Sequence, residues 1–397
     1  MRQLRSVSQH CKKNSLPRSS IRHPAMPSFG SMRIMIVTDA WFPQTNGVVR
    51  TLAQTAACLG RFGHEVRMIT PRDFHSVACP TYPEIRLSLM PYNKVKLSIL
   101  EFSPQALHIA TEGPLGLCAR RFCLRHGMRF TTSYHTQFPQ YLRARFPIPV
   151  SLSYGALRWF HGAAVRCMVS TASVRCDLES YGFANLAAWQ RGVDTGIFKP
   201  QPKGFLRLPR PIAAYVGRVS VEKNVEAFLD MDWAGSKIVI GDGPLRSRLE
   251  KQYPQVTFVG YRFGEDLASH LAGADVMIFP SRTDTFGLVN LEAMACAVPV
   301  AAYPVAGPID VIEDGVTGAL DLDLAAAARR ALGLDPMACR ERALKSGWDV
   351  CSRQFENNLE RCEIAVQPKL ILASRLVRES ALDSASSSSI RPSRTRL

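Results

Sequence analysis

Segment 279–294 (FPSRTDTFGLVNLEAM) holds a glycine and two acids at a spacing that suits a phosphorylated ligand. We expect a strand to end where the segment begins and Gly287 to open a helix, whose unpaired first N–H groups and dipole attract phosphate. Without a Cβ, Gly287 lets a ligand approach, and Glu292 can accept hydrogen bonds from a ribose diol. The alternative is an ordinary strand–turn–helix, with Thr283 or Asp284 as N-cap and Glu292 on a polar face.

Two cations are predicted near the carboxyl end of another strand. In segment 215–224 (YVGRVSVEKN), Arg218 follows a strand and a glycine, and Lys223 lies at a helix start. Both could clamp a diphosphate, and the guanidinium of Arg218 suits bidentate contact. Alternatively, both are solvated surface charges. The turn 240–244 (IGDGP), with Gly241, also follows a strand, but such turns are common connections.

The first half of the chain offers two further candidates. Residues 38–50 (TDAWFPQTNGVVR) form a loop that ends at Gly47 and a helix start. The loop lacks the G-x-G-x-x-G dinucleotide fingerprint, yet Gly47 could present its N–H to a phosphate. Residues 131–141 (TTSYHTQFPQY) place His135 at the carboxyl end of a strand, where it could act in catalysis or serve as a structural hydrogen-bonding group.

Other motifs are weaker. Asp321 and Asp323 have the D-x-D spacing of some metal–diphosphate sites, but helix capping explains them better, so we expect no metal. The 11 cysteines are scattered without a C-x-x-C pair. We interpret them as small buried hydrophobes in a reducing compartment.

Short apolar runs that alternate with helical stretches must position these residues. The expected strands are 34–37, 65–69, 107–110, 130–133, 168–171, 212–216, 237–240, 256–259, 276–279 and 298–301. Such alternation predicts β-α-β units and parallel sheets. Because 397 residues exceed one usual core, we expect two doubly wound α/β domains of the Rossmann type, facing each other across a cleft.

The division expected from composition has six parts. They are a disordered or wrongly assigned extension at 1–31, a first domain at 32–198, a linker at 199–211, a second domain at 212–355, a helix at 356–379 that crosses back to the first domain, and a disordered tail at 380–397. The crossing helix belongs to a helical run expected at about 337–378. Residues 1–31 lack a secretory apolar core, and a transit peptide is the less favoured alternative.

The net charge of +16 lies partly in the two ends, and the remaining body is moderately basic. That balance suits an anionic partner: phosphorylated substrate, lipid surface or nucleic acid. We expect no nucleic acid, because no zinc-finger spacing, RNP-like motif or helix-turn-helix is evident. No apolar run approaches the roughly 18 residues that cross a bilayer. We therefore expect a cytoplasmic protein, with or without peripheral attachment to the inner membrane.

Together these segments resemble glycosyltransferase family 4, the retaining GT-B enzymes, over roughly residues 32–355. The distinctive element is the paired-acid pattern E-x7-E, here Asp284 and Glu292, followed by AMACAVPV, with GRVSVEKN and GDGP at the right distances upstream. Two departures stand out. Asp284 replaces the usual Glu, which shortens its reach toward a sugar hydroxyl, and Ala297 stands where a Gly is usual.

The resemblance implies a role for each site residue. Catalytic roles fall to His135, Arg218, Lys223 and Asp284, and donor-binding roles to Gly47, Gly217, Gly241, Thr285, Phe286, Gly287, Leu288 and Glu292. Glu292 would bind the donor ribose, and Arg218 and Lys223 the diphosphate. Gly47 would touch the diphosphate, and His135 would lie by the donor sugar.

The implied reaction retains the anomeric configuration and needs neither metal nor cofactor. The donor would be a UDP- or GDP-sugar, and its leaving phosphate would take the acceptor's proton. Within the family, the sequence most resembles members that modify lipids. This resemblance suggests a lipid acceptor and an anionic membrane surface. Basic residues interleaved with aromatic ones fit that partner, and the alternative is that they simply solvate helix faces: Arg120, Arg121, Arg125, Arg129, Arg143, Arg145, Tyr154, Arg158, Trp159, Phe160 and Arg166. A soluble acceptor and a decayed nucleotide-sugar-binding protein are the alternatives.

Overall fold

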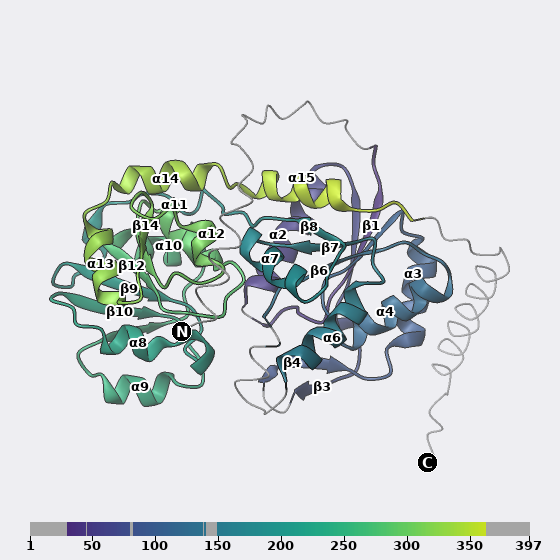
Figure 1. Ribbon diagram of the computed structural model, residues 1–397, viewed down its shortest axis with the longest axis horizontal. Helices are drawn as coiled ribbons and strands as arrows, with labels where there is room; N and C mark the ends of the chain where they lie inside the picture. The colour runs from purple at the N-terminus through teal and green to yellow at the C-terminus, as the bar shows by residue number, and fades with distance from the viewer. Residues whose placement is uncertain (1–29, 45, 80–81, 138, 140–148, 363–397) are drawn as a thin grey trace, which may run out of the picture.

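The computed structural model describes residues 30–362 except 45, 80–81, 138 and 140–148, and these form two α/β domains side by side (Figure 1). The extension expected at 1–31 therefore lies almost wholly outside the described residues, and so does the tail expected at 380–397. None of the helices in the described ranges combines the length and apolar character that a membrane span requires.

The first domain is built on a six-stranded parallel sheet in the order β2-β1-β5-β6-β7-β8. Its strands are β1 (Arg33–Val37), β2 (Glu65–Ile69), β5 (Ala106–Ile109), β6 (Thr131–Ser133), β7 (Arg166–Val169) and β8 (Leu186–Ala188). Its helices are α2 (Gly47–Arg61), α3 (Tyr92–Phe102), α4 (Pro114–Arg125), α6 (Val150–His161) and α7 (Ala172–Ser180). Strand β5 is buried at every residue, as expected where helices cover both faces of a sheet. Outside this sheet, strands β3 (Ser76–Cys79) and β4 (Tyr82–Ser88) pair with each other as an antiparallel hairpin.

The second domain repeats the plan with the order β11-β10-β9-β12-β13-β14. Its strands are β9 (Ile212–Val216), β10 (Ser236–Ile240), β11 (Thr257–Gly260), β12 (Val276–Phe279), β13 (Val300–Ala302) and β14 (Gly318–Leu320). Its helices are α8 (Val225–Asp230), α9 (Arg246–Gln252), α10 (Gly264–Gly273), α11 (Leu288–Ala295), α12 (Pro308–Val311), α13 (Leu324–Leu332) and α14 (Pro336–Leu344). The predicted doubly wound, two-domain architecture is confirmed.

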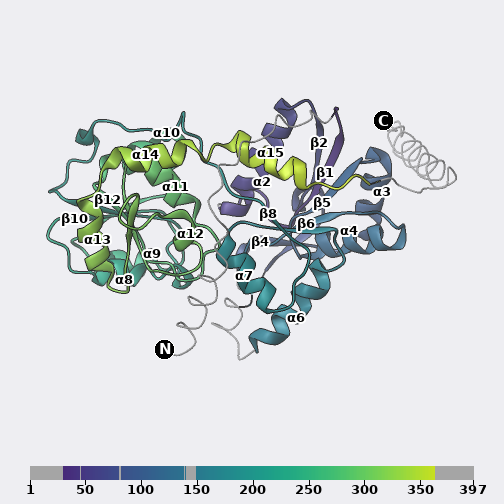
Figure 2. The same ribbon diagram turned by 45° about the horizontal axis from the view of Figure 1, so that its top comes forward.

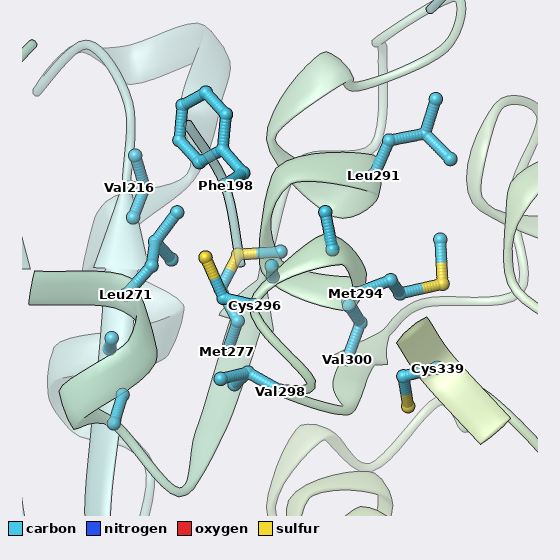
Figure 3. Packing of buried hydrophobic residues seen from close by; sticks show 14 of the residues in the cluster. Phe198, Val216, Leu271, Met277, Leu291, Met294, Cys296, Val298, Val300 and Cys339 are labelled. Atoms are coloured by element: carbon cyan, nitrogen blue, oxygen red, sulfur yellow. The ribbon is translucent and has the colours of Figure 1, made fainter. Parts of the chain in front are cut away.

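Helix α11 is anchored by the core of the second domain. Its Leu291 and Met294 belong to a buried cluster that includes Met277 of β12 and Val300 of β13 (Figure 3). Burial of each such side chain stabilises the fold by about 1.5–3 kcal/mol. The amino end of α11 is thus held on a rigid support at the carboxyl end of β12.

The chain crosses between the domains twice, and the two crossing segments pair with each other. Val193 and Gly347 form a β-bridge, and Val193 N donates to Ser346 O at 2.8 Å. The segment expected as a linker, 199–211, instead lies against the second domain, where Leu206 and Leu208 pack on its core. The chain therefore passes between the domains before the proline-rich segment. That segment belongs to the second domain and runs along its surface.

The helix that crosses back lies earlier than expected. Two helices, α14 and α15 (Trp348–Asn358), replace the start of the continuous run expected at 337–378, because the extended Gly347 separates them. Helix α15 packs on α2 of the first domain, as Figures 1 and 2 both show. Of the crossing helix expected at 356–379, the part beyond residue 362 lies outside the described residues.

Candidate functional site

The predicted ligand-binding segments of the second domain meet at the carboxyl ends of its central strands. Gly217 follows β9, Gly241 follows β10, and loop 280–287 follows β12. These three strands are neighbours in one sheet. This edge is where open α/β sheets bind ligands. Contacts between the loops tighten the arrangement: Asn224 Nδ2 donates to Pro280 O at 3.1 Å.

Glycines at this edge permit close backbone packing. A Cβ on Gly241, where φ is +154°, would lie 1.8 Å from Gly217 O. A Cβ on Gly287, where φ is +77°, would lie 2.8 Å from Phe279 Cζ. The G-D-G turn, a weak signal in the sequence, is therefore required by the approach of two loops.

Gly287 is the N-cap of α11, and no side chain caps the helix or places an acid in its first turn. The alternative in which Thr283 or Asp284 caps the helix is therefore wrong. Glu292 is only 4% exposed, so it does not lie on a solvated polar face either. Because no side chain caps α11, its first N–H groups, at Leu288 and Val289, are suited to an anion.

Both acids of the paired-acid motif contact a cation. Lys223 Nζ lies 2.5 Å from Asp284 Oδ1, and Arg50 of α2 forms an ion pair with Glu292 Oε1. The second carboxylate oxygen of each acid is buried and has no hydrogen-bond partner among the described residues. Buried polar atoms are normally paired, so these two oxygens are suited to ligand hydroxyl groups.

Arg218 begins the loop that leads from β9 to Lys223. Its side chain is half-buried, and its carbonyl accepts a hydrogen bond from Tyr215 Oη at 2.7 Å. Lys223 closes the short 3-10 turn η4 (Val221–Lys223). The structure thus sets both predicted cations on the loop that adjoins Asp284.

The first domain contributes its own strand ends to this region. Thr285 Oγ1 donates to His135 O at 2.8 Å, and Ser170 Oγ donates to Thr285 O at 3.1 Å. Gly47, at the start of α2, lies against Leu288, since a Cβ on Gly47 would be 3.4 Å from Leu288 Cδ1. The predicted residues of the two domains are therefore brought together.

The His135 ring is fixed by two hydrogen bonds. Arg191 Nη2 donates to Nδ1 at 3.2 Å, and because guanidinium only donates, the proton of the ring must be on Nε2, which lies 2.8 Å from Ser133 Oγ. Burial, the charge of Arg191 and the nearby His108 lower the pKa of His135 well below its usual value. The ring is neutral, and the contact with the second domain is made by its backbone carbonyl.

Two residues of this region were missed in the sequence. Arg50 lies one helical turn after Gly47, a spacing that could have flagged it. Arg191 is buried in the segment that connects the domains, and its Nη1 donates to Trp189 O at 2.6 Å. Nothing local in the sequence marks Arg191 as a neighbour of His135.

The weaker motifs have structural roles. Asp323 Oδ1 accepts from the backbone N of Ala325 at 2.9 Å, so the capping interpretation is confirmed for Asp323, while Asp321 Oδ1 accepts from the backbone N of Asp323 at 3.0 Å. In the described part of the chain, no three His, Cys, Asp or Glu side chains gather as a metal site requires. The nine cysteines whose side chains are described are free, and seven of them are buried, as interpreted.

The basic and aromatic segments divide into buried and exposed members. Arg120, Tyr154 and Phe160 are buried. Arg120 stacks 3.9 Å over the ring of Trp159 and packs α4 against α6, whereas Tyr154 Oη donates to Asp177 of α7 at 2.9 Å. Arg129 and Arg166 both pair with Glu360. Arg143 and Arg145 lie outside the described residues. The outer face keeps exposed apolar and basic side chains: Leu117, Arg121, Leu124 and Arg125 on α4, and Leu152, Arg158 and Trp159 on α6.

Two doubly wound parallel-sheet domains joined in this way have the GT-B architecture of many glycosyltransferases. The protein-family model described as Glycosyltransferase Family 4 matches residues 45–196, and the family model described as Glycosyl transferases group 1 matches residues 210–334. Together the two models cover more than half of the chain. The chain belongs to the family 4, or group 1, glycosyltransferases.

Curated relatives and solved structures agree with this membership. A GDP-mannose-dependent alpha-mannosyltransferase of Mycobacterium tuberculosis is 28% identical over 73% of this chain and 83% of its own length. The sulfoquinovosyl transferase SQD2 of Arabidopsis thaliana is 28% identical over 81% of this chain and 72% of its own. The fold is similar to that of a sucrose-phosphate synthase from Thermosynechococcus elongatus, with a TM-score of 0.65 and 21% identity over 82% of this chain and 97% of that one.

Proposed function

We propose that the protein transfers a hexose from a nucleotide diphosphate sugar to an acceptor hydroxyl, with retention of the anomeric configuration. The observation that carries the proposal is the pairing of Lys223 with Asp284 and of Arg50 with Glu292 beside the open first turn of α11. In the complex, Glu292 accepts hydrogen bonds from the ribose diol and Asp284 from a sugar hydroxyl. Each has a buried, unpartnered oxygen for that purpose.

The chemistry follows from charge. The bond between the sugar C1 and the β-phosphate oxygen breaks, the acceptor oxygen bonds to C1 on the same face, and the acceptor's proton passes to the leaving phosphate. Arg218, Lys223 and the N–H groups at the start of α11 stabilise the negative charge that grows on this phosphate. These cations give the charge stabilisation without a metal ion or cofactor.

His135 has a positioning role in this scheme. Its neutral ring is held by Arg191 and Ser133, and its carbonyl fixes Thr285, next to Asp284. Through these contacts the first domain would fix the position of loop 280–287 relative to the bound sugar.

A lipid hydroxyl is the proposed acceptor. The relatives include a sulfoquinovosyl transferase and an alpha-monoglucosyldiacylglycerol synthase, the latter 26% identical over 82% of this chain. In the first domain, Leu152 is 68% exposed and Trp159 is 60% exposed on the same face of α6, with Arg158 beside them. Exposed apolar side chains beside an arginine suit an anionic membrane surface, which favours a lipid acceptor over a soluble one.

The donor assignment can be tested with purified protein and a panel of UDP- and GDP-sugars. We expect one donor to raise the melting temperature and to be consumed when diacylglycerol or phosphatidylinositol is supplied in detergent. Proton NMR of the product should show the anomeric configuration of the donor. Binding of a nucleotide sugar without any transfer or hydrolysis would favour the decayed binding protein, and an inverted product would refute retention.

The membrane surface can be tested by flotation with vesicles of phosphatidylglycerol or of phosphatidylcholine alone. We expect binding to the anionic vesicles and a loss of binding in Leu152→Ser. Leu322→Ser, which removes an equally exposed leucine from the second domain, is the matched control and should float like the parent protein. Equal flotation of both variants would contradict this surface.

A further inference from the structure

Arg50 is the cation that the second acid of the motif contacts across the domain boundary. It belongs to α2 of the first domain, and its guanidinium pairs with Glu292 Oε1 of α11. The two side chains differ in burial: that of Glu292 is 5% exposed and that of Arg50 is 43% exposed. Partly exposed ion pairs contribute little to stability. Because the Glu292 carboxylate is buried, Arg50 can leave it at small cost only when ligand hydroxyl groups take its place.

Arg50 lies close to the amino ends of two helices, α2 and α11. Gly47, at the start of α2, lies against the side chain of Leu288, at the start of α11, and neither helix has an acid in its first turn. Two positive helix ends that lie close together favour an anion beside them. Arg50 lies one turn into α2, on the same face as Gly47.

We propose that Arg50 is a further donor-binding residue, whose guanidinium moves from Glu292 to the diphosphate when the nucleotide sugar binds. This inference rests on the proposed function. The exchange couples two events at one residue: the diphosphate gains a bidentate donor, and Glu292 is released for the ribose diol. A guanidinium fork suits phosphate oxygens, and the diphosphate carries more charge than one carboxylate.

The exchange predicts a specific dependence on the diphosphate group. A nucleoside without phosphates must displace Arg50 from Glu292 and offers the guanidinium no new partner. A nucleoside diphosphate displaces it and provides one. The ratio of nucleoside Kd to nucleoside diphosphate Kd should therefore contain the contribution of Arg50.

Calorimetric titration with UDP, uridine, GDP and guanosine would measure this ratio in the full-length protein, Arg50→Gln and Arg50→Lys. We expect Arg50→Gln to bind the nucleoside as tightly as the parent protein or more tightly, and the ratio to fall about 10- to 100-fold, the range of a charge-assisted hydrogen bond. Arg50→Lys, which keeps the charge and loses the fork, should fall between. Arg61→Gln removes another ion-paired arginine of α2, at its far end, and should match the parent protein.

The possible results separate the proposals. If Arg50 only blocks Glu292, both ligands bind Arg50→Gln more tightly and the ratio stays constant, which overturns the exchange. If Arg50 is a structural contact alone, thermal stability falls and neither the ratio nor the affinities change, which also overturns it. If the parent protein binds neither UDP nor GDP, the proposed function itself fails. Circular dichroism of each variant checks that it is folded, and Arg50→Lys provides the ratio should Arg50→Gln not fold.

Discussion

Lys223 Nζ lies 2.5 Å from Asp284 Oδ1, so a cation and an acid that are 61 positions apart meet across the loops that follow β9 and β12. The shorter side chain of Asp284, compared with the usual Glu, still reaches Lys223. The substitution therefore keeps a charged pair at this position. It also leaves Asp284 Oδ2 buried and available for a sugar hydroxyl.

Glu292→Ala should weaken donor binding about 10- to 100-fold. The ribose diol would lose charge-assisted hydrogen bonds worth roughly 1.5–3 kcal/mol, and the gain from no longer displacing Arg50 is smaller. Calorimetric titration with the preferred nucleotide sugar measures the change. Glu341→Ala, an exposed acid on α14, should bind like the parent protein. Unchanged affinity in Glu292→Ala would remove Glu292 from the ribose site.

Treatment with EDTA should leave the transfer rate unchanged. Arg218, Lys223 and the start of α11 supply the positive charge that a metal ion would otherwise supply to the leaving phosphate. The rate is compared before and after dialysis against the chelator, with magnesium or manganese added back. Activity that disappears and returns with either metal would contradict the metal-free scheme.

The architecture could be predicted because its signals are local. Buried parallel strands such as 212–216 and 276–279 are continuous apolar runs, and the structure has β9 and β12 at those bounds. The β3–β4 hairpin was missed because prolines at 80 and 83 argue against a strand. Strand β14 was missed because three residues carry too little pattern.

Ala297→Gly should stabilise the protein by about 0.5–1 kcal/mol. Ala297 follows the end of α11 with a φ of +56°, a left-handed conformation that strains any residue with a Cβ. The family's usual glycine at this position is explained by that backbone, and not by chemistry. Urea denaturation measures the change. Ala326→Gly, inside α13, should instead destabilise by up to about 1 kcal/mol. A loss of stability in Ala297→Gly would contradict the strain.

Acid should destabilise the first domain through His108. Burial, with the charges of Arg191 and His161, lowers the pKa of His108 from 6.5 to about 3. Between these values the unfolded chain binds a proton that the folded protein does not, so the free energy of unfolding falls as the pH falls below about 6.5, by up to about 1.4 kcal/mol per pH unit. The stability difference between the parent protein and His108→Asn should therefore shrink by about 2 kcal/mol from pH 7 to pH 5 in urea denaturation. Parallel pH curves would contradict the assignment.

The site was predicted less completely than the fold, because its contacts join distant segments. The motif around Glu292 is local, and its helix start could be derived from one strand–glycine–helix pattern. Arg50 lies 242 positions away from Glu292, and Arg191 lies 56 positions from His135. The Arg50–Glu292 pair is determined by the way the two domains meet, and the Arg191–His135 pair by the loops that follow β6 and β8 of one sheet. No spacing in the sequence encodes either contact.

Arg218→Ala and Lys223→Ala should each lower kcat by about 10²- to 10³-fold, similar to the loss of an oxyanion-type donor. The negative charge on the β-phosphate grows as the glycosidic bond breaks, so cations on the loop after β9 are worth more in the transition state than in the donor complex. An interaction of that kind lowers kcat together with kcat/KM when it is removed. Lys345→Ala, which removes an exposed lysine after α14, is the matched control.

The double variant distinguishes a shared role from two independent ones. If Arg218 and Lys223 serve one phosphate charge, their combined loss should cost less than the sum of the single losses. Steady-state kinetics on the two single variants and the double variant, each checked by circular dichroism, measures this coupling. Variants that raise only KM would mean that both cations anchor the donor without assisting its departure. The leaving-group charge would then fall to the N–H groups of α11 that begin after Gly287, because the helix start is the remaining positive end beside the phosphate.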